Sequence, residues 1–156
     1  MRLEDQAGIQ LALRGDLGAV TFFRYSLTLK GQVQDQDPLL SDVLDWIKAA
    51  GVTELKSVSA SYGKGKQVLI VTMAFSNNVL ANICLNMTGK GLGYIKKTEL
   101  VGTKGLYVFD SESETAFTSD CVVPDNYDLM AVNPLNQQWL NVINTSLMSG
   151  EMEVVK

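Results

Sequence analysis

The sequence predicts an α+β domain: an open-faced, largely antiparallel sheet of about six strands with helices on one face. Three observations indicate this class. The length of 156 residues favours a single domain spanning residues 1–156. Most segments in which apolar residues recur every second position lie together in the middle of the chain, and the two clearest helical segments flank that block. Strands separated from helices in this way are typical of α+β domains.

The first third of the chain contains a strand, preceded by a segment of undecided type. Residues 4–14 carry apolar positions that fit either a short helix or a ragged strand, and the pattern does not decide between them. Residues 19–29 are rich in β-branched and aromatic side chains, which predicts a strand. A polar loop is expected to follow over residues 31–37.

A helix is predicted from Asp37 to Gly51. Asp37 is a suitable N-cap, and Pro38 then occupies the first helical position, where a missing N–H is tolerated. Gly51 supplies the C-terminal stop. The apolar stripe of this helix consists of Leu40, Val43, Leu44 and Ile47.

From residue 52 the apolar period changes to two, which indicates consecutive strands. They are predicted at residues 52–62, 67–76, 79–87, 94–101 and 106–110, with a short one near 115–118. Asn77 and Asn78 indicate a tight hairpin, because Asn tolerates the positive φ that such a turn requires.

A last helix is predicted to begin at the cap Asn133, with Pro134 in its first position, and to end at Gly150. Its apolar stripe consists of Leu135, Trp139, Val142, Ile143 and Leu147.

The strand at residues 68–75 is apolar on both faces, which is unusual for a sheet with one face in water. Two helices can cover only one face of about six strands. The second face therefore predicts an interface, and a homo-oligomer formed through the open sheet is the simplest one. The alternative is that coil or the N-terminal segment folds over this face.

Composition excludes several functions. The chain has no His, which removes Ser-His-Asp and Cys-His catalysis and most zinc sites. Its two Cys form no CxxC pair, so a reducing, cytoplasmic setting is expected. A net charge of −4 and no long apolar run predict neither nucleic-acid nor membrane binding. The basic spots at 64–66 and 96–97 are interpreted as a turn and a solvated strand end.

No cofactor or metal site is predicted in this chain. The Gly-rich segments 89–93 and 102–105 lie between strands and lack the spacing of a phosphate-binding loop, so they are expected to be hairpin turns. The dipole of the first predicted helix accounts for most of the acids near its start. Arg24, a lone charge within an aromatic strand, is either a ligand for a substrate anion or a solvated side chain.

The order of motifs resembles the C-terminal domain of the Gfo/Idh/MocA family of NAD(P)-dependent oxidoreductases. The segments that carry the resemblance are LRGDLGAV at 13–20, DPLLS at 37–41, FSNNVLA at 75–81, ELVGTKG at 99–105 and MSGE at 148–151. Together they span about residues 13–151 in the family order. The resemblance implies an open-faced sheet that shapes a substrate pocket and makes the oligomer interface.

The resemblance further implies a parent oxidoreductase that uses NAD or NADP and acts on a sugar, polyol or related alcohol. The family's N-terminal dinucleotide-binding domain is absent from this sequence, so the chain alone is expected to be inactive. Ser41 stands at the position of the family's catalytic His, and Leu44 stands at that of its second Asp. No catalytic residue is therefore predicted, and Arg24, Asp37 and Ser41 are the substrate-binding candidates.

Two rival functions remain open. The chain could be a free-standing, non-catalytic dimeric binding or scaffold module derived from such a domain, as the missing His favours. It could also be a small α+β carrier or isomerase with a pocket between sheet and helices, although no acid lies in the predicted strand cores. Whether the chain belongs to an enzyme therefore stays undecided at the level of sequence.

Overall fold

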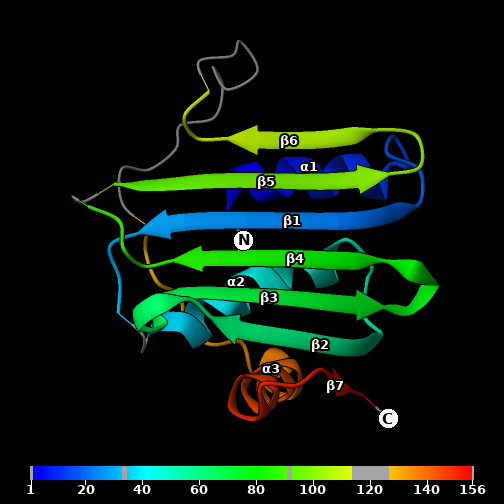
Figure 1. Cartoon of the computed structure of the whole chain (residues 1–156). Coiled ribbons are helices and arrows are strands. Elements are labelled where there is room, and N and C mark those ends of the chain that lie inside the picture. Colours follow the sequence, from blue (N-terminus) through cyan, green and yellow to red (C-terminus); the bar gives the residue numbers. More distant parts are fainter. Residues whose placement is uncertain (1, 33–34, 91–92, 114–126, 156) are drawn as a thin grey trace.

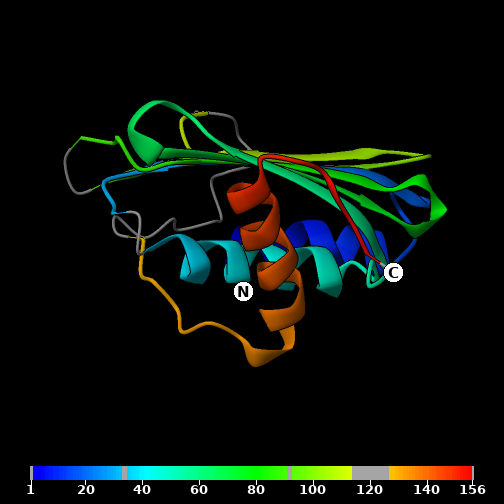
Figure 2. The same cartoon turned by 60° about the horizontal axis from the view of Figure 1, so that its bottom comes forward.

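A seven-stranded sheet with three α-helices on one face makes up the part of the chain described by the computed structural model, residues 2–32, 35–90, 93–113 and 127–155 (Figure 1). Figure 2 shows the helices gathered on the same side of the sheet. The strand order is β6-β5-β1-β4-β3-β2-β7, and every neighbouring pair is antiparallel except β1 with β4. The predicted fold class is confirmed.

The predicted strands agree with the observed ones to within three residues at each end. The bounds are α1 Leu3–Leu13, β1 Val20–Leu29, α2 Gln36–Ala49, β2 Leu55–Tyr62, β3 Val68–Phe75, β4 Leu80–Asn86, β5 Tyr94–Gly102, β6 Leu106–Asp110, α3 Gln137–Ser149 and β7 Glu153–Val154. The two-residue β7 was not predicted, and the predicted strand near 115–118 lies outside the described residues. Asn77 and Asn78 both have a φ of 60°, which confirms the tight turn between β3 and β4.

The core lies between the sheet and the helices. Each central strand turns one set of alternate side chains toward it, as the period of two predicted. In β3, for example, Leu69, Val71 and Met73 are fully buried, whereas Ile70 on the opposite face is 42% exposed. The inner face is thus covered and the outer face carries apolar side chains in the open.

Helix α2 begins earlier than predicted, and Asp37 is not its cap. The helix starts at Gln36, so Asp37 lies in its first turn, and Asp35 occupies the N-cap position without a side-chain cap hydrogen bond. Asp35 instead accepts from the backbone N–H of Gln32 (2.7 Å). The Tyr62 hydroxyl donates to Gln36 Oε1 at 2.8 Å, which holds Gln36 in the helix.

Helix α3 begins as predicted, through a short 3₁₀ turn at Pro134–Asn136. The Asn133 side chain accepts from the backbone N–H of Leu135 at 3.0 Å, which confirms it as the cap. Trp139 and Ile143 are buried, and their helix packs against β2. Leu135 was expected in the same stripe but is 78% exposed, because it lies in the 3₁₀ turn, where the helical period does not yet hold.

The undecided segment 4–14 is helix α1, which lies beneath β5 and β6 (Figure 1). It is not amphipathic in the usual sense. Ile9 is its one buried large apolar side chain, whereas Leu3 and Leu13 are each about two-thirds exposed. Glu4 and Asp5 are buried in its first turn. The alternation that favoured a strand therefore had no structural meaning here.

Candidate functional site

Arg24, the first predicted substrate-binding residue, lies on the outer face of the sheet. Its position in β1 alternates with the buried Phe23 and Tyr25, so its side chain points away from the helices. The guanidinium meets Glu99 on β5 at 3.4 Å, and the Arg24 side chain remains 55% exposed. An exposed pair of this kind is worth less than about 1 kcal/mol to folding.

Asp37 and Ser41, the other two candidates, lie on α2, on the opposite side of the sheet from Arg24. The structure therefore brings Asp37 and Ser41 to one helix but does not bring Arg24 to them. Ser41 is 1% exposed. Its Oγ accepts from the backbone N–H of Asn133 (2.9 Å) and from Asn136 Nδ2 (3.0 Å).

The same segment of chain, Tyr127–Asn136, also binds two acids of α2. Asp42 Oδ2 accepts from the Tyr127 hydroxyl at 2.8 Å. Asp45 Oδ1 accepts from Asn133 Nδ2 and from Asn136 Nδ2, each at 2.8 Å. Ser41, Asp42 and Asp45 are thus all hydrogen-bonded to one segment, and we call Tyr127–Asn136 the α2 strap.

A buried group of charges, which we call the Lys96 cluster, lies between α1 and β5. It consists of Lys96, Glu4 and Asp5. The Lys96 ammonium donates to Glu4 Oε1 at 2.9 Å and to Asp5 Oδ2 at 2.6 Å, and all three side chains are at most 3% exposed. Burial is the largest effect on Asp5 and raises its pKa to about 6, although Lys96 opposes the shift.

Sequence reasoning missed the Lys96 cluster, and its interpretation of residues 96–97 as a solvated strand end is wrong for Lys96. The strand period of two was the available signal. It places Lys96 on the same face as Thr98 and Leu100, which are both fully buried, and Lys97 on the outer face. The acids that pair with Lys96 are some ninety residues distant in sequence, so nothing local identifies them.

Hydrogen bonds and ring contacts link the surroundings of the Lys96 cluster to the α2 strap. The Lys96 ammonium lies 5.1 Å from the centre of the Tyr25 ring. The hydroxyls of Tyr25 and Tyr127 are 2.7 Å apart, and burial raises the pKa of both. Arg2 lies 3.5 Å above the Tyr127 ring and 3.5 Å from Asp42 Oδ2. The N-terminal residues therefore hold the start of the strap against α2.

The Gly-rich segment 102–105 is a hairpin turn, as predicted, and its role is structural. A Cβ on Gly102 would lie 2.1 Å from the carbonyl oxygen of Leu17, so only glycine fits there. The backbone N–H of Lys104 donates to that same oxygen at 2.9 Å. The motifs at 13–20 and 99–105 therefore pack against each other, which explains their joint presence without a bound phosphate.

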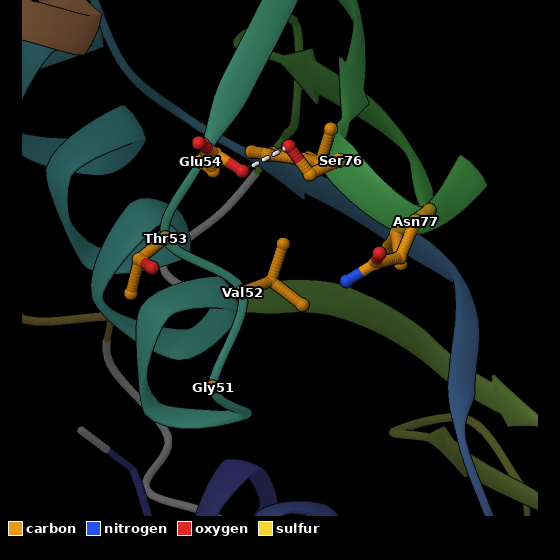
Figure 3. A pocket seen from close by; sticks show the side chains of 8 residues that line it. Gly51, Val52, Thr53, Glu54, Ser76 and Asn77 are labelled. Atoms are coloured by element: carbon orange, nitrogen blue, oxygen red, sulfur yellow. Dashed lines mark hydrogen bonds between the residues drawn. The ribbon is translucent and has the colours of Figure 1, made fainter.

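A small surface pocket lies where α2 ends and the β3–β4 turn begins (Figure 3). Glu54 and Ser76 are joined by a hydrogen bond at its rim, and Asn77 points its amide toward the opening. The pocket measures about 140 Å³. Ligand pockets are commonly about 300–1,000 Å³, so a dinucleotide does not fit here.

The outer face of the sheet is the largest candidate site, and no helix or strand in the described ranges covers it (Figure 2). Strand register aligns its side chains in rows across the sheet. One row is apolar from β6 to β3, where it consists of Leu106, Val101, Phe22, Leu80 and Ala74, and it ends at Ser57 on β2. The next row is mostly polar and consists of Val108, Glu99, Arg24, Asn82, Thr72 and Ser59. The expectation that this face is apolar is thus confirmed for one row.

The described residues hold neither a metal-binding cluster nor a membrane-spanning helix. They contain no group of three or more His, Cys, Asp and Glu side chains placed to hold a metal ion. Among the same residues, no helix is long and apolar enough to cross a membrane.

Several solved proteins, two inositol dehydrogenases among them, have a similar fold. The myo-inositol dehydrogenase from Corynebacterium glutamicum ATCC 13032 matches with a TM-score of 0.69 at 14% identity, over 99% of this chain and 62% of that one. The apo scyllo-inositol dehydrogenase from Lactobacillus casei matches with 0.68 at 12% identity, over 97% and 60%. GenD2 from gentamicin A biosynthesis, in complex with NAD, matches with 0.64 at 14% identity, over 99% and 61%.

No family model matches the chain, and no curated protein matches its sequence. Identities this low show a common fold. The chain spans about three fifths of the length of these three proteins, so it corresponds to one part of them. The fold of this chain is therefore one that inositol dehydrogenases contain within a longer protein, which confirms, at the level of fold, the resemblance to the Gfo/Idh/MocA oxidoreductases.

Proposed function

We propose that this chain is the substrate-facing and oligomerising domain of an NAD(P)-dependent oxidoreductase that acts on a sugar, polyol or related alcohol, and that it is inactive alone. One observation carries the proposal: 97–99% of the chain matches inositol dehydrogenases, but only about 60% of their length is matched. The elements of the described ranges do not follow the alternating strand-helix order of a dinucleotide-binding domain. A second domain would therefore supply NAD or NADP.

The size of the native protein tests this proposal directly. An antibody raised against the chain should detect, in a lysate of the source organism, a band two to three times larger than 17.0 kDa. The enriched native protein should oxidise a polyol with NAD or NADP, whereas the isolated 156-residue chain should not. A native band at 17.0 kDa with no partner domain contradicts the proposal.

Such a band would favour a second function, that of a non-catalytic binding or scaffold module. The observation on its side is the α2 strap. Ser41 stands where the family has its catalytic His, yet its hydroxyl is buried and already accepts two hydrogen bonds. Within the oxidoreductase proposal, Asp37 and Ser41 remain the substrate candidates on α2, and Arg24 acts at the oligomer interface instead.

The proposed oligomer forms through the outer face of the sheet. Six strands, each about 4.8 Å wide and about 25 Å long, present roughly 700 Å² of projected surface, and the side chains that rise from it make its accessible area larger. A stable interface buries about 800 Å² of accessible area per partner, so the face is of suitable size. The apolar row through Phe22 and Leu80 would lie at its core, and the Arg24–Glu99 pair beside it.

Light scattering after gel filtration tests this interface. Leu80, 46% exposed on β4, should tolerate Leu80→Lys in the monomer, but a charge in the apolar row should dissociate the oligomer. Met148→Lys is the matched control, because Met148 is 83% exposed at the end of α3 on the other side of the sheet. A monomeric wild-type chain, or a Leu80→Lys variant that still associates, contradicts the proposed face.

Cys84 offers a second measurement, because it lies half-buried on the outer face of β4. Desolvation raises the pKa of its thiol, which already slows thiol labelling. In a Cys121→Ser background, association should slow labelling further, so that the rate falls as protein concentration rises. A rate independent of concentration contradicts an interface at this face.

A further inference from the structure

We propose that α1 is a latch under proton control: it docks on the sheet through the Lys96 cluster, and ionisation of Asp5 loosens it. The inference is independent of the proposed function, because it rests on the contacts of α1 alone.

Helix α1 buries little apolar surface. Of its apolar side chains, only Ile9 is fully buried; Leu11 and Ala12 are partly buried, and Leu3 and Leu13 are about two-thirds exposed. At about 25 cal/mol per Å² of apolar area, one buried isoleucine stabilises docking by only about 2–3 kcal/mol. The buried charges of the Lys96 cluster therefore decide whether α1 stays docked.

The Lys96 cluster holds more negative than positive charge when both of its acids are ionised. Two carboxylates, Glu4 and Asp5, share one ammonium group, and Asp5 Oδ1 has no hydrogen-bond partner. An unpaired buried polar atom is costly, and a buried excess charge more so. A proton on Asp5 would remove the excess charge and leave a simple Glu4–Lys96 pair.

Among the residues that the structure describes, Lys96 is the one cation in contact with Asp5. The titratable and charged groups around the cluster are Lys96 on β5, Tyr25 on β1, Tyr107 on β6, Asp42 on α2, and Arg2 and Tyr127 beside α1. Arg2 is the other cation, and it is engaged with Asp42 and with the Tyr127 ring. The Tyr107 hydroxyl donates to the Glu4 carbonyl oxygen at 2.6 Å.

The sign of the pH dependence follows from these contacts. Docked Asp5 has a pKa of about 6, raised first by burial, against an ordinary value of 3.8 once α1 detaches and Asp5 meets water. The docked state therefore binds the proton more tightly, so docking strengthens as pH falls below 6 and weakens as pH rises. Between pH 5.2 and 7.5 these two values change the opening equilibrium by about sevenfold.

Native-state hydrogen exchange is the test, read on the α1 amides and, for comparison, on those of β3, with intrinsic exchange rates divided out. In the wild-type chain, the opening constant of α1 should rise about sevenfold from pH 5.2 to 7.5, while that of β3 stays constant. Asp5→Asn should abolish the rise and lower the opening constant at pH 7.5. Asp16→Asn, which changes an exposed acid just after α1, should behave as wild type.

Equal pH dependence in α1 and β3, or an Asp5→Asn variant that keeps the sevenfold rise, would overturn the proposal. A measurement on the unmodified chain guards against a variant that fails to fold: carboxyl chemical shifts should show Asp5 titrating near pH 6. An Asp5 that titrates near pH 4 would overturn the proposal as well.

Discussion

Helices α1 and α2 cover the same face of the same sheet but are attached to it by different forces. Six of the eight buried residues of α2 are apolar, and the centre of the Trp46 ring lies 5.3 Å from that of Phe23 and 5.9 Å from that of Tyr25. The buried face of α1 presents Glu4 and Asp5 to Lys96. The packing of apolar side chains does not depend on pH, whereas attachment through the Lys96 cluster depends on whether Asp5 is protonated. Within one helical layer, α2 is therefore attached independently of pH, whereas the attachment of α1 depends on pH.

The largest effect on stability is expected from a substitution in the buried face of α2. Trp46→Ala removes the largest fully buried side chain and should lower the free energy of unfolding by about 3–5 kcal/mol, since the cavity cannot collapse under two aromatic rings. Urea unfolding followed by circular dichroism measures it. Leu135→Ala, at a 78% exposed position, should change stability by less than about 0.5 kcal/mol. A Trp46→Ala loss below about 1 kcal/mol would remove the contrast between the helices.

A smaller effect, confined to α1, is expected from a substitution in the Lys96 cluster. Lys96→Met leaves two buried carboxylates without a cation, a change that typically costs about 3 kcal/mol or more. Because α1 can detach, the loss should be confined to it. Hydrogen exchange should show α1 amides nearly unprotected while those of β3 keep wild-type protection. Global unfolding of the variant would contradict this, because it would show that α1 cannot detach while the rest of the domain stays folded.

The α2 strap provides the next test. Ser41→Ala removes the acceptor for Asn133 and Asn136, and should cost about 1–2 kcal/mol of stability. Ser61→Ala, on an exposed serine of β2, is the control. In a full-length oxidoreductase, unchanged activity of Ser41→Ala would contradict a substrate contact and leave Ser41 a purely structural role. A stability change equal to that of Ser61→Ala would show that the hydrogen bonds from Ser41 to the strap do not stabilise the fold.

The smallest effect is expected at the start of α3. Asn133→Ala removes the cap that accepts from Leu135, together with one donor to Asp45, and should cost about 1 kcal/mol in urea unfolding. Asn133→Ser keeps an acceptor for the cap but loses the donor to Asp45 without adding a charge, so it should fall between alanine and wild type. A serine variant no better than alanine would place the effect in the strap rather than in the cap.

Patterns with a local physical cause could be predicted from the sequence. The period of two gave the strands β1 to β6 because alternate side chains must lie on opposite faces, and Asn77, Asn78 and Gly51 gave turns because their positions require positive φ. The start of α2 was misplaced because Gln36 is held by Tyr62, a partner 26 residues away.

The candidate sites were less predictable, since they depend on contacts between distant segments. Arg24 and Ser41 were grouped by chemistry, but the sheet separates them. Lys96 was read as solvated, because its partners Glu4 and Asp5 lie at the other end of the chain. The segment 4–14 could not be assigned for the same reason: a helix that docks through ion pairs shows no apolar stripe.

The one parallel pair of the sheet has a consequence for how the chain is made. Strand β1 lies in the middle of the sheet, between β4 and β5, which the ribosome synthesises more than fifty residues later. Until then β1 has unpaired edges and an aromatic surface, while the β2–β3 hairpin forms from local contacts. The nascent chain therefore passes through a stage prone to aggregation, and a chain released after β3 should depend on chaperones because its central strand has no neighbour.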